Sequence, residues 1–124
     1  MINNDEKIKF LGKLHINFKR SETIYQNYID NKKQFLFAKI LKRSNEETLN
    51  LLKDNSYLLS DELINDSIKL ICHLDIWIEK WNALANKNKP NLNDEFVFEN
   101  SFRFPKDAAQ NLDKEFIEIR DKKN

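Results

Sequence analysis

The stretch SDELINDSIKLICHLDIWIEKWNALANKNK, residues 60–89, has the pattern of one long amphipathic helix around which the fold is organised. Its apolar residues recur every three to four positions, the spacing that places side chains on one face of an α-helix. The members of this stripe are Leu63, Leu70, Ile71, Leu74, Trp77, Ile78, Trp81, Leu84 and Ala85. Ser60 is a suitable N-cap, and Lys89 followed by Pro90 is a suitable end. The sequence therefore predicts a central packing helix between these residues.

Three side chains in this helix carry further expectations. Trp77 and Trp81 lie at the centre of the stripe, so we expect both indoles to be largely buried. Cys72 is the single cysteine and cannot form an internal disulfide, which favours a reducing, cytosolic compartment. Because its neighbours are apolar, we expect a buried and unreactive thiol.

Two further helical regions precede the central helix. The spacing of Ile8, Leu11, Leu14 and Phe18 predicts a helix over residues 5–20. Polar residues at Arg20–Ser21 predict a break there, with Ser21 capping a second helical region from Glu22 to about Asp54.

The second helical region has two interpretations and a clear end. The sequence Ser44-Asn45-Glu46-Glu47 matches a capping box and favours a restart, while an uninterrupted helix is equally allowed. We expect the region to end at Asn55–Ser56 and residues 57–59 to form an apolar loop beneath the central helix.

After Pro90 the pattern changes. Residues 95–104 read EFVFENSFRF, which fits either a small β-hairpin turning at Asn100–Ser101 or an irregular loop anchored by phenylalanines. Pro105 then introduces a last helix from Lys106 to about Arg120. The predicted architecture is all-α, a single domain over residues 1–124 with about four helices and a small Phe-rich hairpin or loop before the last helix.

Composition and spacing argue against several kinds of catalytic or cofactor site. The chain has one glycine in 124 residues, so glycine-rich phosphate loops and the serine nucleophile elbow are excluded. Cys72, His15 and His73 lack the paired spacing of a zinc site. Helical ribonucleases of the HEPN type carry an arginine a few residues before a histidine, and neither histidine here has one. We therefore expect no enzyme activity, no cofactor and no metal.

One candidate ligand face lies on the central helix. His73, Trp77 and Trp81 follow one another at intervals of four residues and so share a helix face. An imidazole beside two indoles can bind a planar or cationic ligand by stacking and cation–π contact. The alternative is a partly buried histidine within an aromatic core.

Charge is distributed unevenly along the chain. Residues 1–43 hold ten basic and four acidic residues, a net charge of +6, which leaves −5 for the remainder. This basic half permits binding to nucleic acid or to an acidic partner, and it equally permits attraction between the two halves. Aromatic and basic residues of the second helical region form a candidate interaction surface with an apolar centre and a charged rim. Its members are Tyr25, Tyr28, Lys32, Lys33, Phe35, Phe37 and Lys39.

The predicted function follows from these patterns. Residues 45–106, with NEETLNLL, YLLSDELI and HLDIW, resemble in general pattern small bacterial proteins, and no functional residue is carried over from that likeness. We expect a non-enzymatic helical interaction protein of the cytosol that self-associates or serves as a subunit of a larger assembly. The alternative is a nucleic-acid-associated or nuclease-like helical protein using residues 1–43. No apolar run is long enough for a membrane partner.

Overall fold

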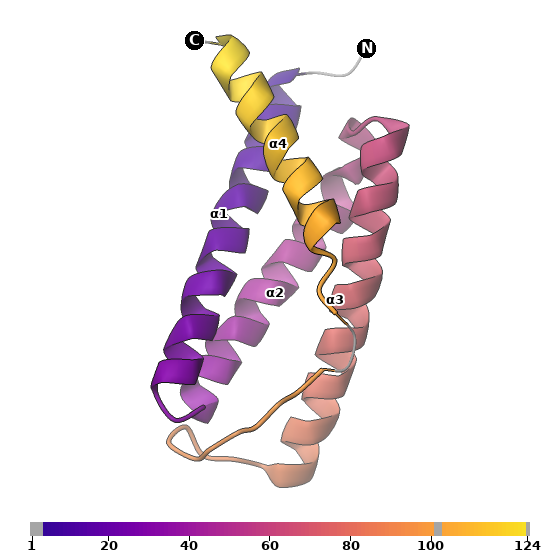
Figure 1. Ribbon diagram of the computed structural model, residues 1–124. Helices are drawn as coiled ribbons and strands as arrows, with labels where there is room; N and C mark the ends of the chain where they lie inside the picture. Colours follow the sequence, from indigo (N-terminus) through magenta and orange to yellow (C-terminus); the bar gives the residue numbers. More distant parts are fainter. Residues whose placement is uncertain (1–3, 101–102, 124) are drawn as a thin grey trace.

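Four long helices make up most of the computed structural model, which describes residues 4–100 and 103–123 (Figure 1). Among these residues there is no strand, so the predicted all-α bundle is confirmed. In chain order the helices are α1 (Asn4–Asp30), α2 (Phe35–Asn55), a short 3₁₀ turn η1 (Ser56–Leu58), α3 (Asp61–Asn88) and α4 (Lys106–Lys123).

The helices form a ring in which each packs against two neighbours, in the order α1, α2, α3, α4 and back to α1. Figure 1 shows α4 crossing obliquely in front of the upper half of the bundle, while the lower half is spanned only by the chain leading from α3 to α4. Gly12 lets α4 approach α1 closely, since a Cβ atom there would lie 3.3 Å from a ring carbon of Phe116. The start of α1 and the end of α4 lie at the same end of the molecule.

The buried side chains fall into two clusters. The larger one, here called the aliphatic core, occupies the half that α4 covers. It contains Phe10, Leu11, Leu14, Leu49, Leu52, Leu58, Leu59, Leu63, Leu70, Leu74, Ala108, Ala109 and Leu112. The smaller one, here called the aromatic core, lies at the opposite end of the helices. It is built from Tyr28, Ala38, Trp81 and Phe96, with Phe35, Phe37, Trp77, Leu84, Ala85 and Phe98 packed against them.

The predicted break at Arg20–Ser21 is wrong, because α1 continues through it to Asp30. The Ser21 hydroxyl does not cap a helix; it hydrogen-bonds across the interface to Ser44 at 2.8 Å and to Asn45 at 3.1 Å on α2. Ser44 is fully buried in an unbroken α2, so the uninterrupted helix is the one of the two interpretations that forms. Polar residues that suggested helix ends are therefore contacts between two continuous helices.

The chain turns instead at residues 31–34, where Lys32 and Lys33 adopt positive φ values of 58° and 52°. Residues other than glycine adopt this region at a cost, so outside contacts must stabilise the turn. The segment before α4 supplies them. The Phe96 N–H donates to the Lys33 carbonyl at 2.8 Å, and the first N–H groups of α2, on Phe35 and Leu36, donate to the carbonyls of residues 94 and 92. These bonds satisfy backbone donors that every helix start leaves free.

The segment over residues 95–104 is irregular where the structure describes it, and the predicted hairpin does not form there. Its β-pairing is a single antiparallel bridge between Gln34 and Glu95. Part of the predicted turn, Ser101, lies outside the described residues, as does Phe102. The alternative prediction, a loop anchored by phenylalanines, describes Phe96 and Phe98, which pack in the aromatic core.

The central helix closely matches its predicted ends, with Ser60 at the N-cap position and Lys89 in the left-handed region at the C-cap. The Ser60 side chain makes no capping hydrogen bond. Two burial predictions need correction. Trp81 is buried, but Trp77 is only partly so. Cys72 is exposed rather than buried, because it lies on the side of α3 opposite Leu63 and Trp81.

Among the residues described, the helices all lack the combination of length and hydrophobicity needed to cross a bilayer.

Replacing Trp81 with alanine tests the aromatic core. The indole is 4% exposed, stacks on Phe35 at 5.5 Å and lies 4.8 Å beneath the Lys42 ammonium. Loss of a buried aromatic side chain costs about 3–5 kcal/mol in the free energy of unfolding. Tyr57→Ala, at a side chain 70% exposed, is the control and should change stability little. Urea denaturation of the two variants measures both values, and equal midpoints would contradict the assignment of Trp81 to the core.

Candidate functional site

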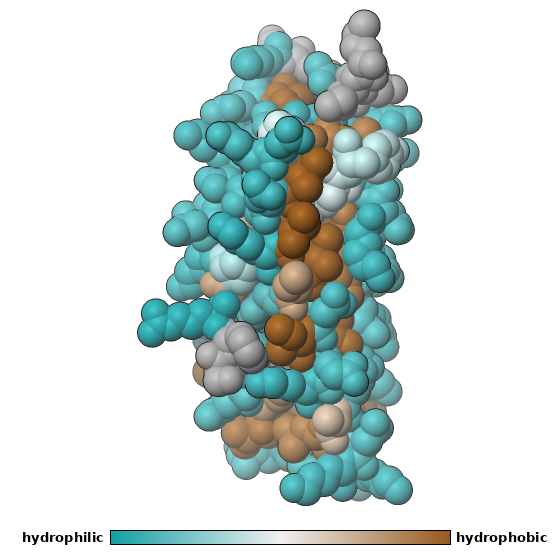
Figure 2. Space-filling view, turned by 90° about the vertical axis from the view of Figure 1, so that its right-hand side faces the viewer, coloured by the Kyte–Doolittle hydropathy of each residue, from teal (hydrophilic) through white to brown (hydrophobic). Residues whose placement is uncertain are grey.

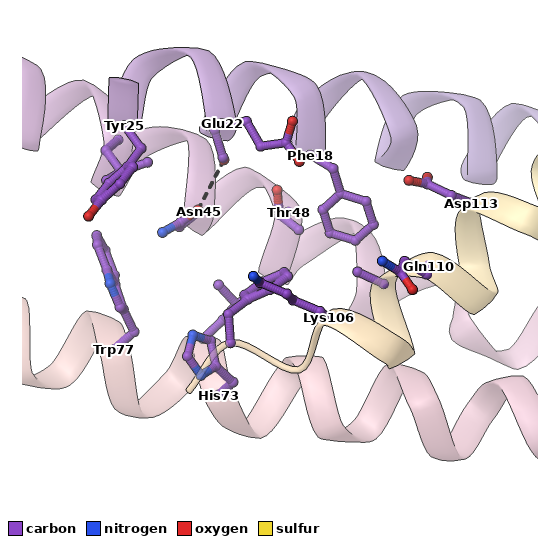
Figure 3. A pocket seen from close by; sticks show the side chains of 15 residues that line it. Phe18, Glu22, Tyr25, Asn45, Thr48, His73, Trp77, Lys106, Gln110 and Asp113 are labelled. Carbon is purple, nitrogen blue, oxygen red and sulfur yellow. Dashed lines mark hydrogen bonds between the residues drawn. The ribbon is translucent and has the colours of Figure 1, made fainter. Parts of the chain in front are cut away.

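A cleft of about 700 Å³ separates the two cores at mid-height of the bundle (Figure 3). Along each of α1, α2 and α3 it falls where one core ends and the other begins. Its lining residues are Phe18, Ser21, Glu22, Tyr25, Leu41, Asn45, Thr48, His73, Leu74, Trp77, Phe104, Lys106, Ala109, Gln110 and Asp113. Four helices thus contribute to one cavity, whose size is within the range of small-molecule sites.

Aromatic side chains form one end of the cleft. Tyr25 on α1 and Trp77 on α3 point toward each other from opposite sides (Figure 3). Trp77 is supported from behind by Phe98, whose ring meets it edge-on at 5.2 Å. Tyr25 is 52% exposed and lies at the mouth. This end therefore offers ring faces and edges to a ligand from both walls.

The floor of the cleft carries uncharged polar groups in a fixed hydrogen-bond chain. Ser44 and Ser21 hydroxyls bond to each other, and the Ser21 hydroxyl donates to the Asn45 side-chain oxygen at 3.1 Å. The Thr48 hydroxyl donates to the Ser44 carbonyl at 3.0 Å. Ser44 and Thr48 are buried. These bonds occupy the Asn45 oxygen and leave its amide nitrogen directed into the cleft (Figure 3).

Residues of α4 and its approach form the other end. The Phe104 ring meets Phe18 edge-on at 6.4 Å, and Lys106, Gln110 and Asp113 come from the first turns of α4. Asp113 accepts a hydrogen bond from the His15 ring at 3.1 Å when that nitrogen carries the proton. The lining thus has three charged groups: Glu22 on α1, Asp113 bonded to His15, and Lys106, whose side chain reaches from α4 over the middle of the cleft (Figure 3).

His73 lies in the wall of the cleft and meets Phe104 edge-on at 5.4 Å. Burial removes water from its ring and lowers the pKa below its ordinary value of 6.5. The imidazole is therefore neutral at physiological pH and adds no positive charge to the cleft.

The predicted ligand face is divided by the structure. His73 and Trp77 both line the cleft, whereas Trp81 belongs to the aromatic core. No residue pattern indicates directly that Tyr25, Asn45 and Thr48 line the same cavity. One pattern could have indicated it: polar residues interrupt the apolar stripes of α1 and α2 at positions that lie side by side in the bundle.

The candidate interaction residues lie in different surroundings. Tyr28 is buried at 4% exposure, and Phe35 and Phe37 pack against the aromatic core, so these rings do not form an exposed aromatic patch. Tyr25 is exposed at the cleft mouth, Lys32 and Lys39 are exposed, and Lys33 is partly buried. Docking of a partner along this region stays a prediction.

Charges of the basic half pair with acidic residues of other helices. Arg20 on α1 forms an ion pair with Glu47 on α2, and Lys7 on α1 lies 3.7 Å from Glu115 on α4. These contacts agree with attraction between differently charged parts of the chain. Within the described part of the chain, no group of three histidine, cysteine, aspartate or glutamate side chains is arranged to hold a metal ion.

A narrow hydrophobic band runs lengthwise over the face shown in Figure 2, which is the α3 side of the bundle. On α3, Ile64, Ile68 and Ile71 share one flank of the helix, and Ile68 is 50% exposed. Ile64 and Ile71 pack partly against the aliphatic core. The band is therefore in part the outer edge of the core.

Acidification should destabilise the fold through His73. The unfolded chain binds a proton at His73 near pH 6.5, whereas the folded chain does so only at lower pH. Unfolding then takes up a proton below pH 6.5, so the free energy of unfolding falls as pH decreases through this window. As the pH falls below 6.5, we expect the free energy of unfolding of His73→Gln, measured by denaturation, to decrease less than that of the unchanged chain. An imidazole NMR titration of His73 with its midpoint at or above 6.5 would contradict this account.

Comparison with protein-family models, with curated proteins and with solved structures finds no match for this chain.

Proposed function

We propose that this chain is a non-enzymatic binding protein that takes a small planar molecule into the central cleft. The observation that carries the proposal is a cavity of about 700 Å³, walled by Phe18, Tyr25, Trp77 and Phe104, between the two cores of the bundle. Protein interiors are close-packed, and an open apolar cavity forgoes stabilising contacts. A ligand with flat apolar faces would restore those contacts, as in known small-molecule sites.

The contacts of the serine and histidine side chains in and beside the cleft favour a binding role over a catalytic one. The Ser21 hydroxyl bonds to Ser44 and Asn45 rather than to a histidine, so it is not paired with a base. His15 bonds to Asp113, and the His73 ring packs against Phe104. Acid–base or nucleophilic chemistry needs a base within hydrogen-bond reach of the reacting group. The cleft instead offers shape, ring contacts and fixed polar groups.

This proposal keeps the binding role predicted from the sequence and changes the kind of partner. The basic residues Arg20 and Lys7 are engaged with Glu47 and Glu115, which weakens the case for a phosphate-binding surface on α1. Tyr28, Phe35 and Phe37 contribute to the aromatic core and so are less able to anchor a protein partner. The cleft brings the exposed Tyr25 and the partly buried Trp77 together at one site.

Binding of naphthalene, a planar apolar probe, tests the proposal. We expect amide and indole NMR signals of cleft residues to shift on titration. Tyr25→Ala and Trp77→Leu should each weaken binding by roughly 5- to 30-fold, which corresponds to about 1–2 kcal/mol. Tyr57→Ala, which removes an exposed ring outside the cleft, should leave the affinity unchanged. Equal affinity in all four proteins, or no binding, would reject the cleft as the site.

A further inference from the structure

The geometry points to a more specific ligand class, and this inference rests on the proposed binding function. We infer that the cleft selects a neutral planar heteroaromatic molecule whose ring nitrogen or carbonyl oxygen accepts a hydrogen bond from the Asn45 amide. Three features support this inference: the direction of the Asn45 amide, the rigidity of the helices and hydrogen bonds that hold it, and the uncharged residues around it.

The direction of the Asn45 amide is set by Ser21. The Ser21 hydroxyl donates to the Asn45 oxygen at 3.1 Å, and this bond turns the amide nitrogen toward the end of the cleft where Tyr25 and Trp77 face each other (Figure 3). An amide nitrogen has two N–H groups and no acceptor lone pair. The cleft therefore presents N–H donors beside its aromatic walls. A ring held there could accept a hydrogen bond from one of them.

The support of Asn45 is buried and continuous. Ser44 is 0% exposed and bonds to Ser21, and the Ser44 carbonyl accepts the Thr48 hydroxyl. Because α1 and α2 are both unbroken through this region, these groups stand on rigid helices rather than on loops. A donor fixed in advance loses little entropy when a ligand binds, which favours selectivity for an acceptor.

The charge distribution favours a neutral ring. The lining residues Leu41, Asn45, Thr48 and Leu74 are uncharged, and burial keeps His73 neutral by lowering its pKa. Of the charged lining groups, Glu22 and Lys106 are exposed, with the Lys106 side chain reaching from α4 over the middle of the cleft (Figure 3), and Asp113 is engaged with His15. A cationic ring beside Asn45 would lose water without gaining an opposite charge there.

A set of bicyclic probes of similar shape tests the inference. Quinoline carries a ring-nitrogen acceptor, naphthalene carries no hydrogen-bonding group, and indole carries an N–H donor. We expect NMR titrations at neutral pH to give quinoline about three- to tenfold higher affinity than naphthalene, the effect of one neutral hydrogen bond.

Variants at Asn45 isolate the amide. Asn45→Leu removes the donor, and Asn45→Asp keeps an oxygen for Ser21 while replacing the amide nitrogen with a second acceptor. Both should abolish the preference for quinoline. Asn50→Leu is the matched control, because Asn50 is exposed on the same helix and lies outside the cleft, and it should keep the preference.

The possible outcomes distinguish the role of Asn45 from the proposed binding of a planar ring in the cleft. Equal binding of quinoline and naphthalene in a Trp77-dependent way would leave the cleft as a ring-binding site and overturn the role of Asn45. A preference for indole would also overturn it, since it would mean that the amide presents its oxygen. Binding of no probe, or binding that ignores Tyr25→Ala and Trp77→Leu, would overturn both proposals. A quinoline preference that persists in both Asn45 variants would assign the acceptor contact to another group and reject the inference.

Discussion

The buried hydroxyl of Tyr28 holds together two parts of the fold that lie far apart in the sequence. It donates to the Phe96 carbonyl and accepts the Phe98 N–H at 3.2 Å, so it joins α1 to the chain between α3 and α4. Burial raises the pKa of this phenol above 10.0, which keeps the donor proton in place at ordinary pH. Leaving such a buried group without its partner costs about 1–3 kcal/mol. The same segment caps the start of α2, so one contact region fixes both the turn after α1 and the approach to α4.

This constraint accounts for the position of the cleft. The aromatic core closes the lower end of the bundle around Tyr28, Trp81 and Phe96, and α4 closes the upper end over the aliphatic core. Between them lie side chains that belong to neither core, such as Asn45 on α2 and His73 on α3, and these line the cleft. The cavity is thus a consequence of two separately packed ends on continuous helices. If the same residues packed into a single core, close packing would fill this space and leave no cavity beside the polar groups.

The helices were predictable because their apolar spacing and the ends of α3 are encoded locally. The turn at Lys32 and Lys33 was not, since no glycine or proline marks it and its support comes from residues 92–96, far along the chain. Ser21 and Ser44 suggested helix boundaries because a polar residue in an apolar stripe has the same appearance whether it caps a helix or bonds across an interface. His73 and Trp77 are two of the three residues of the ligand face predicted from one helix, whereas Tyr25 and Asn45 join them only through tertiary packing.

If the cleft is a formed site, its walls and its hydrogen-bond donor are in place before a ligand binds. A crystal structure of the protein grown with quinoline would then show a bicyclic ring in the cleft against Tyr25 and Trp77. The quinoline nitrogen should lie about 2.7–3.2 Å from the Asn45 amide nitrogen, with the helices unmoved. Collapse of Tyr25 and Trp77 onto each other, or quinoline bound only on the hydrophobic band of α3, would show that the cleft is not such a site.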